Sequence, residues 1–252
     1  MDAVVHRKRR RSRLRAGLLR TRIRRMTRGV LLDIEGTTTP IAFVYEVLFP
    51  YARQQMADYL RTAELTDLRA EYKEDLQAGN NPPDWSVDPL PYIHWLMDRD
   101  RKSTALKRIQ GEIWREGYRL GKLRGEVFED VGPALKGWQA AGTDVRIFSS
   151  GSVLAQRLIF STTPAGDLTQ YLSGYFDTTT GPKNDPASYA KIALAFGLPA
   201  SEIAFISDVT RELDAAREAG IQTLLCVRPG NPVQSPHSHP VIKTFAEIDT
   251  SN

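Results

Sequence analysis

The chain has 252 residues, of which 41% are hydrophobic and 25% charged, a composition typical of a globular protein with a sizeable core. No segment reaches the roughly 18 successive apolar residues of a transmembrane helix, so we expect no membrane span. The positive charge is concentrated at one end, although the net charge of the whole chain is only +4. Residues 1–28 hold 12 Lys and Arg and one acid, whereas the remaining residues hold 22 Lys and Arg and 29 acids. Nucleic-acid binding by this mildly acidic remainder is not expected.

Residues 1–28 form a basic tail that contains the run RKRRRSRLR. We expect this tail to be disordered or not native, because Met26 stands three residues before the first predicted strand and offers a later start. An organelle transit peptide and a nucleic-acid-binding arm are the alternatives for the same residues. The single cysteine, Cys226, lies in the apolar run TLLCV and is expected in the core. One cysteine cannot form an internal disulfide, which suits a reducing compartment, and we expect a cytoplasmic location.

The stretch GVLLDIEGTTTP at residues 29–40 predicts a buried strand that ends in polar residues. Unbroken hydrophobicity over its first four residues is typical of a strand inside a parallel sheet. Asp33 then follows at the carboxyl edge, where such sheets bind ligands. Glu35 comes two residues later, Gly36 permits a sharp turn, and the threonines from Thr37 onward offer hydroxyl and amide donors to an anion. The alternative is ordinary turn chemistry, in which Asp33 caps a helix.

Residues 43–125 show a helical pattern with no convincing strand. Apolar positions follow the three-to-four spacing of one helix face at Leu106, Ile109, Ile113, Gly117 and Leu120. The turn-rich segment GNNPPDW at 79–85 divides the region into two helical pairs. A simple crossover between parallel strands needs only about 30 residues, so the excess predicts a helical cap that can close over Asp33.

Aromatic residues at helical spacing in this region are expected in its core: Trp85, Trp95, Trp114 and Tyr118. The four histidines of the chain lack the spacing of metal ligands, so we expect no zinc site.

Strand and helix patterns alternate in the last half of the chain. Strands are predicted at 144–149, 175–177, 203–206, 222–227 and near 241–245, and helices at 152–160, 186–196 and 209–219. Asp185 is placed to cap the second of these helices, and Gly197 stands just past its end. Such alternation predicts an α/β fold with a doubly wound parallel sheet. The chain then divides into the tail (1–28), an α/β core (29–42 and 126–252) and an inserted all-helical cap (43–125).

Polar residues stand at the ends of several predicted strands. Asp33 and Glu35 follow the first strand, Ser149 and Ser150 follow the next, and Asp208 follows a later one. The carboxyl ends of parallel strands meet at one edge of the sheet, so these side chains are expected to converge. The carboxylates of Asp33 and Asp208, with a main-chain oxygen near Glu35, are the kind of ligands that Mg²⁺ prefers.

The segment SSGSV at 149–153 places Gly151 and two serines just before a predicted helix, where amides and the helix dipole favour a phosphate group. A plain helix cap is the alternative. Lys183, in the loop GPKND, would add a positive charge to the same phosphate, or else lie in solvent. Glu212 lies one helical turn after Asp208 and is expected to support the metal through waters or to hold Lys183.

Four features of residues 29–230 resemble, in their order, the four motifs of the haloacid dehalogenase superfamily. They are the sequence DxxGT, a hydroxyl residue after a strand, a lysine, and an acid after a further strand. More narrowly, four longer segments look like the enolase-phosphatase (acireductone synthase) family of methionine salvage. They are DIEGTTTPI, QGEIWREGYRLGKLRGEVFEDV, FSSGSVLAQ, and FISDVTRELDAAREAG followed by VRPGN. Glu35 replaces the aspartate of most superfamily phosphatases and is itself a feature of the narrower family. The arginine-rich tail departs from the family.

This resemblance implies a Mg²⁺-dependent enzyme that enolises 2,3-diketo-5-methylthiopentyl-1-phosphate and then removes its phosphate to give the acireductone 1,2-dihydroxy-3-keto-5-methylthiopentene. In this chemistry Asp33 attacks phosphorus, Glu35 is the acid-base residue near the leaving oxygen, and both join Asp208 at the metal. The family also implies a monomer. The alternatives are another phosphatase or a haloalkanoate dehalogenase of the same fold, or a nucleic-acid-binding protein led by the tail. The residue that moves the proton in the enolisation is not predicted.

Overall fold

The computed structural model describes residues 21–22 and 27–249, and the centre of this described part is a six-stranded sheet whose neighbouring strands are all parallel. The spatial order is β4-β3-β2-β5-β6-β7. The bounds are β2 (Gly29–Leu32), β3 (Asp144–Phe148), β4 (Gly174–Phe176), β5 (Ile203–Ser207), β6 (Gln222–Cys226) and β7 (Val241–Ile242). The predicted doubly wound α/β fold is confirmed. Asp33 directly follows a central strand, because β2 pairs with β3 on one side and β5 on the other.

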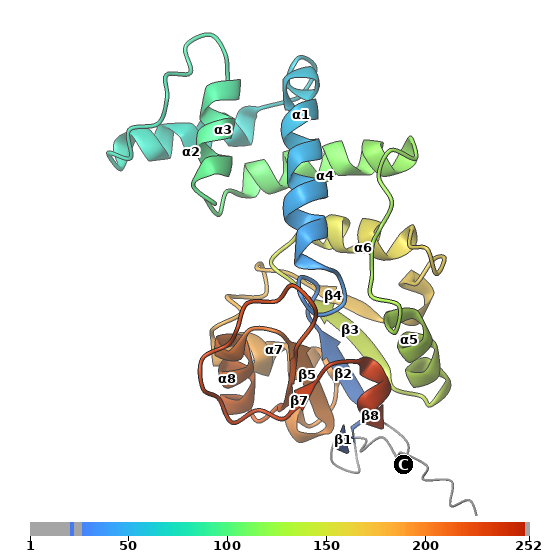
Figure 1. Cartoon of the computed structure of the whole chain (residues 1–252). Helices are drawn as coiled ribbons and strands as arrows, with labels where there is room; N and C mark the ends of the chain where they lie inside the picture. The colour runs from blue at the N-terminus through green and yellow to red at the C-terminus, as the bar shows by residue number, and fades with distance from the viewer. Residues whose placement is uncertain (1–20, 23–26, 250–252) are drawn as a thin grey trace, which may run out of the picture.

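Helices cover both faces of the sheet, because successive side chains of a strand point to opposite faces. Figure 1 shows α5 and α6 beside one face and α7 and α8 beside the other. Within β2, Val30 and Leu32 join the apolar cluster of α5 and α6, whereas Leu31 joins that of α7 and α8. The helices are α5 (Val131–Ala140), α6 (Val153–Ser161), α7 (Pro186–Phe196) and α8 (Thr210–Glu218), with 3₁₀-helices at Thr169–Tyr171, Ala200–Glu202 and Phe245–Glu247.

Local signals fixed the ends of α7. Ala187 N–H donates to the Asp185 carboxylate at 2.9 Å, and Gly197 ends the helix with a φ of 66°. The helix therefore begins and ends as predicted. α5 was not predicted, and no side chain caps its first turn.

The described residues 43–125 form four α-helices that lie beyond the carboxyl ends of the strands (Figure 1). They are α1 (Phe49–Leu60), α2 (Thr66–Gln77), α3 (Leu90–Asp98) and α4 (Thr104–Arg119), and a π-helix over Phe43–Leu48 leads into α1. The loop at 79–85 separates the two predicted pairs. The buried face of α4 follows the predicted spacing as far as Gly117. Leu120 does not continue it: this side chain is 52% exposed, because the helix has already ended.

The aromatic residues expected in the core of this helical segment are buried, with exposed fractions of 5–8% for Trp85, Trp95, Trp114 and Tyr118. Cys226 is also buried, as expected. None of the helices in residues 21–22 and 27–249 has both the length and the apolar character needed to cross a bilayer.

A small second sheet joins two residues of the basic tail to the end of the chain: β1 (Thr21–Arg22) pairs in parallel with β8 (Ile248–Asp249). Neither strand was predicted. The folded body also begins before Gly29, since Thr27 is buried and Arg28 N–H donates to the main-chain oxygen of Glu202 at 2.8 Å. The predictions for residues 1–20 and 23–26 lie outside the described residues.

Arg228 follows β6 and joins the C-terminal segment to the loop after β2. Its Nη1 donates to both carboxylate oxygens of Asp130, at 3.0 and 2.9 Å, and its Nε donates to the main-chain oxygen of Thr37 at 3.1 Å. The guanidinium also lies over the rings of Phe128 and Phe245. The loop after β2 is thereby held against the body of the fold.

Candidate active site

Asp33 is the first residue after β2, and its side chain is held at both carboxylate oxygens. Oδ1 accepts from Ile34 N–H at 2.8 Å and lies 2.7 Å from Lys183 Nζ. Oδ2 accepts from the Ser207 hydroxyl at 2.8 Å. Ser207 ends β5, so the pairing of two central strands brings these side chains together. Only 2% of Asp33 is exposed, and its contacts fix the carboxylate in one orientation.

Lys183 enters the site from the loop after β4 and joins Asp33 to Glu212. Its Nζ lies 2.7 Å from the Asp33 carboxylate and 2.6 Å from that of Glu212. Burial acts to lower the Lys183 pKa, but the charges and hydrogen bonds of the two carboxylates outweigh it and raise the pKa above its usual value. The group is therefore an ammonium ion at neutral pH. Of the two roles expected for Glu212, holding Lys183 is the one observed.

Asp208, the residue after β5, brings another carboxylate close to Asp33. Burial, followed by the charge of Asp33, raises the Asp208 pKa to about 7. The same two causes, in the same order, raise the pKa of Glu212 to about 8 and that of Glu35 above its usual value. Four acidic side chains thus share a largely buried region with one ammonium group, that of Lys183, and burial and the Asp33 charge raise the pKa values of the other three acids.

Gly36 allows the loop after β2 to pass close to Asp208. Its φ is 70°, a conformation that favours glycine, and a Cβ at this position would lie 2.3 Å from Asp208 Oδ2. The Gly36 main-chain oxygen accepts from Asn231 Nδ2 at 2.9 Å. The sharp turn predicted at Gly36 is present, and it places the backbone against a carboxylate.

The threonines after Gly36 do not offer amide donors to a ligand. The main-chain N–H groups of Thr37, Thr38 and Thr39 all donate to the Ile34 oxygen, at 3.1, 3.0 and 2.9 Å, and all three residues are buried. The amide part of the predicted anion contact is wrong, because these donors close the turn itself. The hydroxyls of Thr37 and Thr39 form no hydrogen bond with a described residue, so the hydroxyl part stays a prediction. Thr37 instead supports the site through its main-chain oxygen, which binds the Arg228 guanidinium.

The serine loop, residues 149–152, joins β3 to α6. The Ser149 hydroxyl donates to Glu35 Oε2 at 3.2 Å and accepts from Gly151 N–H at 3.1 Å. These contacts fix the position of the Glu35 carboxylate relative to the loop. Glu35, Ser149 and Gly151 therefore lie together, although they were predicted separately as acid-base, phosphate-binding and supporting residues.

Ser152, rather than Ser149 or Ser150, caps α6: its Oγ accepts a main-chain N–H of the first turn at 3.3 Å. The main-chain N–H groups of Ser150 and Ser152 have no hydrogen-bond partner within the described part of the chain. Free amides at the N-terminus of a helix suit an anion such as phosphate.

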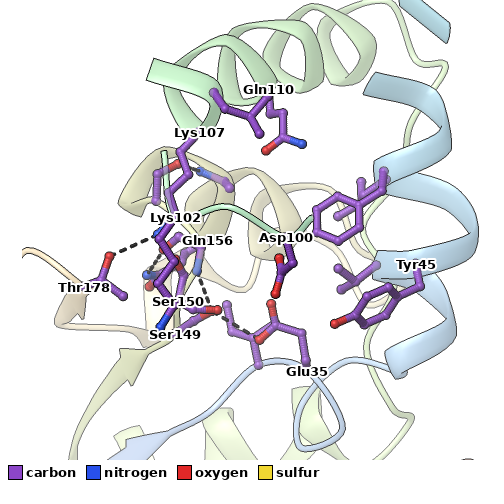
Figure 2. Close-up of a pocket in the computed structure, with 18 of the residues that line it drawn as sticks. Glu35, Tyr45, Asp100, Lys102, Lys107, Gln110, Ser149, Ser150, Gln156 and Thr178 are labelled. Atoms are coloured by element: carbon purple, nitrogen blue, oxygen red, sulfur yellow. Dashed lines mark hydrogen bonds between the residues drawn. The ribbon is translucent and has the colours of Figure 1, made fainter. Parts of the chain in front are cut away.

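A cavity of about 550 Å³ lies between this edge of the sheet and the helical segment (Figure 2). Glu35, Lys183, Glu212 and the serine loop line it from the sheet, whereas Asp33 and Asp208 are not among its lining residues. The helical segment supplies an apolar wall that includes Val44, Leu48, Phe49, Leu96, Leu106 and Trp114. It also supplies polar side chains at Tyr45, Asp100, Lys107 and Gln110.

The donor set beside Asp208 consists of carboxylates and main-chain oxygens. No group of three or more His, Cys, Asp or Glu side chains suited to a metal occurs among residues 21–22 and 27–249. Asp33 and Asp208 nevertheless lie close enough for one charge to raise the pKa of the other, and Asp208 forms no ion pair with a described residue. Two neighbouring carboxylates, one of them outside any ion pair, fit a hard cation that keeps several waters. The donor set therefore suits Mg²⁺.

Sequence reasoning missed the polar residues on the far side of the cavity. Tyr45, Asp100 and Lys107 carry no spacing that points to a site. Gln110 had a signal, because it opens one of the segments on which the family resemblance rests. Asn231, whose amide holds Gly36, likewise ends such a segment.

Comparison with known proteins agrees with this geometry. Residues 27–220 match the family described as haloacid dehalogenase-like hydrolase. The chain is 50% identical over 231 residues to Enolase-phosphatase E1 of Synechococcus elongatus, covering 87% of this chain and 96% of that protein. It is 46% identical over 229 residues to the protein of that name from Pseudomonas aeruginosa, covering 88% and 97%. The crystal structure of the UTR4 protein of Saccharomyces cerevisiae matches with a TM-score of 0.71 and 36% identity, covering 87% and 98% of the two chains. The chain therefore belongs to the enolase-phosphatase family of haloacid dehalogenase-like hydrolases.

Proposed function

We propose that the protein is a Mg²⁺-dependent enolase-phosphatase of methionine salvage. It converts 2,3-diketo-5-methylthiopentyl-1-phosphate to the acireductone 1,2-dihydroxy-3-keto-5-methylthiopentene and inorganic phosphate. The observation that carries this proposal is a set of contacts at the ends of neighbouring strands: Lys183 pairs with Asp33, and the serine loop bonds to Glu35. Lys183, Glu35 and the serine loop line one cavity. Relatives about half identical in sequence, which are named enolase-phosphatases, support it.

Asp33 is the proposed nucleophile. Its carboxylate is already oriented by Lys183, Ser207 and a main-chain amide. Attack on phosphorus gives an aspartyl-phosphate, which divides one displacement into two easier steps. The free amides of the serine loop and the Lys183 ammonium bind the phosphate oxygens and stabilise the charge that develops on them.

Glu35 is the proposed acid-base residue of the phosphoryl transfer. It lines the cavity, and Ser149 fixes its carboxylate. Burial raises its pKa, so that it can carry a proton closer to neutral pH than an ordinary glutamate. In this role it protonates the leaving oxygen and then activates the water that hydrolyses the aspartyl-phosphate.

Asp33, Asp208 and the main-chain oxygen of Glu35 would hold Mg²⁺, which when bound neutralises negative charge on the transferred phosphoryl group. Gly36 supports these ligands, because only a residue without a Cβ leaves room for the Asp208 carboxylate. Glu212 supports them by holding Lys183, which pairs with Asp33.

The helical segment at 43–125 is proposed to be a cap domain inserted into an α/β core of residues 29–42 and 126–252. Closing of this cap would exclude water from Asp33 during the reaction. Its apolar wall suits the methylthioethyl end of the substrate. We propose that the enzyme acts as a cytoplasmic monomer without a nucleic-acid partner.

The test follows ultraviolet absorbance and phosphate together, because the conjugated enol forms before phosphate leaves. The purified protein is given the diketone phosphate or simple sugar phosphates, with Mg²⁺ or with EDTA. We expect a transient enol and phosphate from the diketone phosphate, and loss of phosphate release with EDTA. Preference for sugar phosphates would leave the Asp33 chemistry intact and refute acireductone synthesis. Metal-independent release of halide from a haloalkanoate would instead indicate a dehalogenase.

A further inference from the structure

Helix α4 presents two polar side chains to the cavity, Lys107 and Gln110, that the phosphoryl transfer does not use. They lie three residues apart on the helix and therefore on the same face. Figure 2 shows both projecting from α4 into the space that faces Glu35 and the serine loop.

Lys107 bonds only to neutral groups. Its Nζ donates to the main-chain oxygen of Ser150 at 3.0 Å and to Thr178 Oγ1 at 3.1 Å. No carboxylate within the described part of the chain forms an ion pair with it, whereas Lys183 is paired with two. An ammonium group has three N–H donors, so one donor of Lys107 remains available to a ligand. The charges of Asp177, Asp100 and Glu35 act on the ammonium group without pairing with it. Burial lowers the Lys107 pKa, which eases the release of a proton from this group.

Gln110 is an independent sign of a ligand. The residue is only 7% exposed and lines the cavity, and its carboxamide forms no hydrogen bond with any described residue. A buried amide is normally satisfied by a partner. The cavity side is where such a partner would bind, because the carboxamide points there (Figure 2).

We propose that Lys107 and Gln110 form the diketone subsite of the enzyme, with Lys107 Nζ on the C2 carbonyl oxygen and the Gln110 amide on the C3 carbonyl oxygen. The inference rests on the proposed function. Lys107 contacts the serine loop, where phosphate binds, and C2 is the carbon next to the one that carries the phosphate. Two neighbouring carbonyl oxygens match two donors one helical turn apart, and the rest of the substrate then faces apolar residues of the same helix, Leu106 and Trp114.

Lys107 is thereby a catalytic residue of the enolisation. The carboxylate of Glu35 takes a proton from C1, and the electrons of that C–H bond form the C1=C2 double bond. The π electrons of the C2 carbonyl move to its oxygen, which takes a proton from the Lys107 ammonium. Glu35 then holds the proton that the leaving oxygen needs in the phosphoryl transfer. Before the next turnover the neutral amine of Lys107 regains a proton from solvent, and Glu35 releases to solvent the proton that it took from the hydrolytic water.

The experiment separates the two halves of the reaction in the full chain. Enol formation is measured by ultraviolet absorbance with the diketone phosphate, and phosphatase activity is measured with p-nitrophenyl phosphate, which cannot enolise. The variants are Lys107→Met, Lys107→Arg and Gln110→Leu. The control is Lys122→Met, which removes the charge of an exposed lysine just after α4.

Loss of one donor to a developing oxyanion typically costs on the order of 100-fold in rate, and we expect Lys107→Met to slow enol formation by about that factor. Its p-nitrophenyl phosphate activity should change only a few-fold. Lys107→Arg should recover part of the enolisation, and Gln110→Leu should lower kcat/KM for the diketone by on the order of tenfold. Lys122→Met should behave like the native enzyme on both substrates.

If Lys107→Met slowed enol formation and p-nitrophenyl phosphate hydrolysis by the same factor, the proposal would be overturned. Lys107 would then only hold the helix against the serine loop. Native rates of enol formation in Lys107→Met would overturn the proposal as well. A native enzyme that hydrolyses p-nitrophenyl phosphate but never forms the enol would refute the proposed function itself, and this subsite with it.

Discussion

Replacing Gly36 by alanine tests the position of Asp208 most directly. At a φ of 70° a residue with a Cβ is strained by about 1–2 kcal/mol. The new Cβ would lie 2.3 Å from Asp208 Oδ2. The carboxylate must therefore retreat by roughly 1 Å to restore an ordinary contact. Gly36→Ala should thus cost stability and also displace a proposed metal ligand.

Gly79 supplies a matched control. Its φ is 72°, and an added Cβ would meet nothing within 4 Å. Gly79→Ala therefore carries the same backbone strain without the displacement of a carboxylate. Both variants should lose about 1–2 kcal/mol of unfolding free energy. Only Gly36→Ala should also lose kcat/KM, on the order of 100-fold, since a 1 Å misplacement in a site can cost that much.

The assay combines urea unfolding with phosphate release from p-nitrophenyl phosphate over a series of Mg²⁺ concentrations. Gly36→Ala should need more Mg²⁺ for half-maximal activity than Gly79→Ala. If the two variants showed the same activity and the same Mg²⁺ dependence, Asp208 would not be a metal ligand held against the loop, and the reasoning from the Gly36 contact would fail.

Three further outcomes are expected. Asp33→Asn should keep the fold but abolish phosphate release, because an amide is a poor nucleophile. Retained phosphate release would show that Asp33 is not the nucleophile. Glu35→Gln should slow turnover and let phosphate accumulate on Asp33, which intact-mass measurement would detect, and normal turnover would remove the acid-base role from Glu35. Asp130→Asn should destabilise the fold by about 3–5 kcal/mol at neutral pH, because it leaves the buried Arg228 without a counter-charge. Burial acts to raise the Asp130 pKa, but hydrogen bonds from Phe245, Arg228 and Thr244 outweigh it and lower the pKa, so this stability is present at neutral pH and is lost as the pH falls below about 4. Urea unfolding at several pH values checks this. The control is Glu116→Gln, which breaks an exposed ion pair and should change the unfolding free energy little. A difference in unfolding free energy between the native protein and Asp130→Asn that stayed constant down to pH 2 would contradict the expectation.

Features with local causes could be predicted from the sequence. The strand before Asp33 was recognisable because a buried parallel strand is apolar at every position. The ends of α7 followed from Asp185, Pro186 and Gly197, since capping and backbone freedom act within a few residues. The approach of Asp33 to Asp208, and of Glu35 to the serine loop, also followed, because parallel strands place their carboxyl ends at one edge of a sheet.

The threonines after Gly36 show where local reasoning fails. Their composition is compatible with an anion site or with a closed turn. Only the folded loop shows that their main-chain N–H groups donate to the main-chain oxygen of Ile34. Similarly, nothing around Arg228 in the sequence indicates that Asp130, about a hundred residues earlier, would be its partner.

The tertiary structure alone decided which side chains face Glu35 and the serine loop across the cavity. Helical periodicity identified the apolar face of α4, but Lys107 and Gln110 become part of the site only because α4 packs against α6 beside the serine loop. Hydrophobic patterning determines which face of a helix is buried, whereas the segment that it packs against depends on long-range contacts that leave no local signal. The sequence therefore determined the proposed nucleophile and the strand ends that carry the phosphoryl chemistry, and the packing of α4 determined the residues that would meet the rest of the substrate.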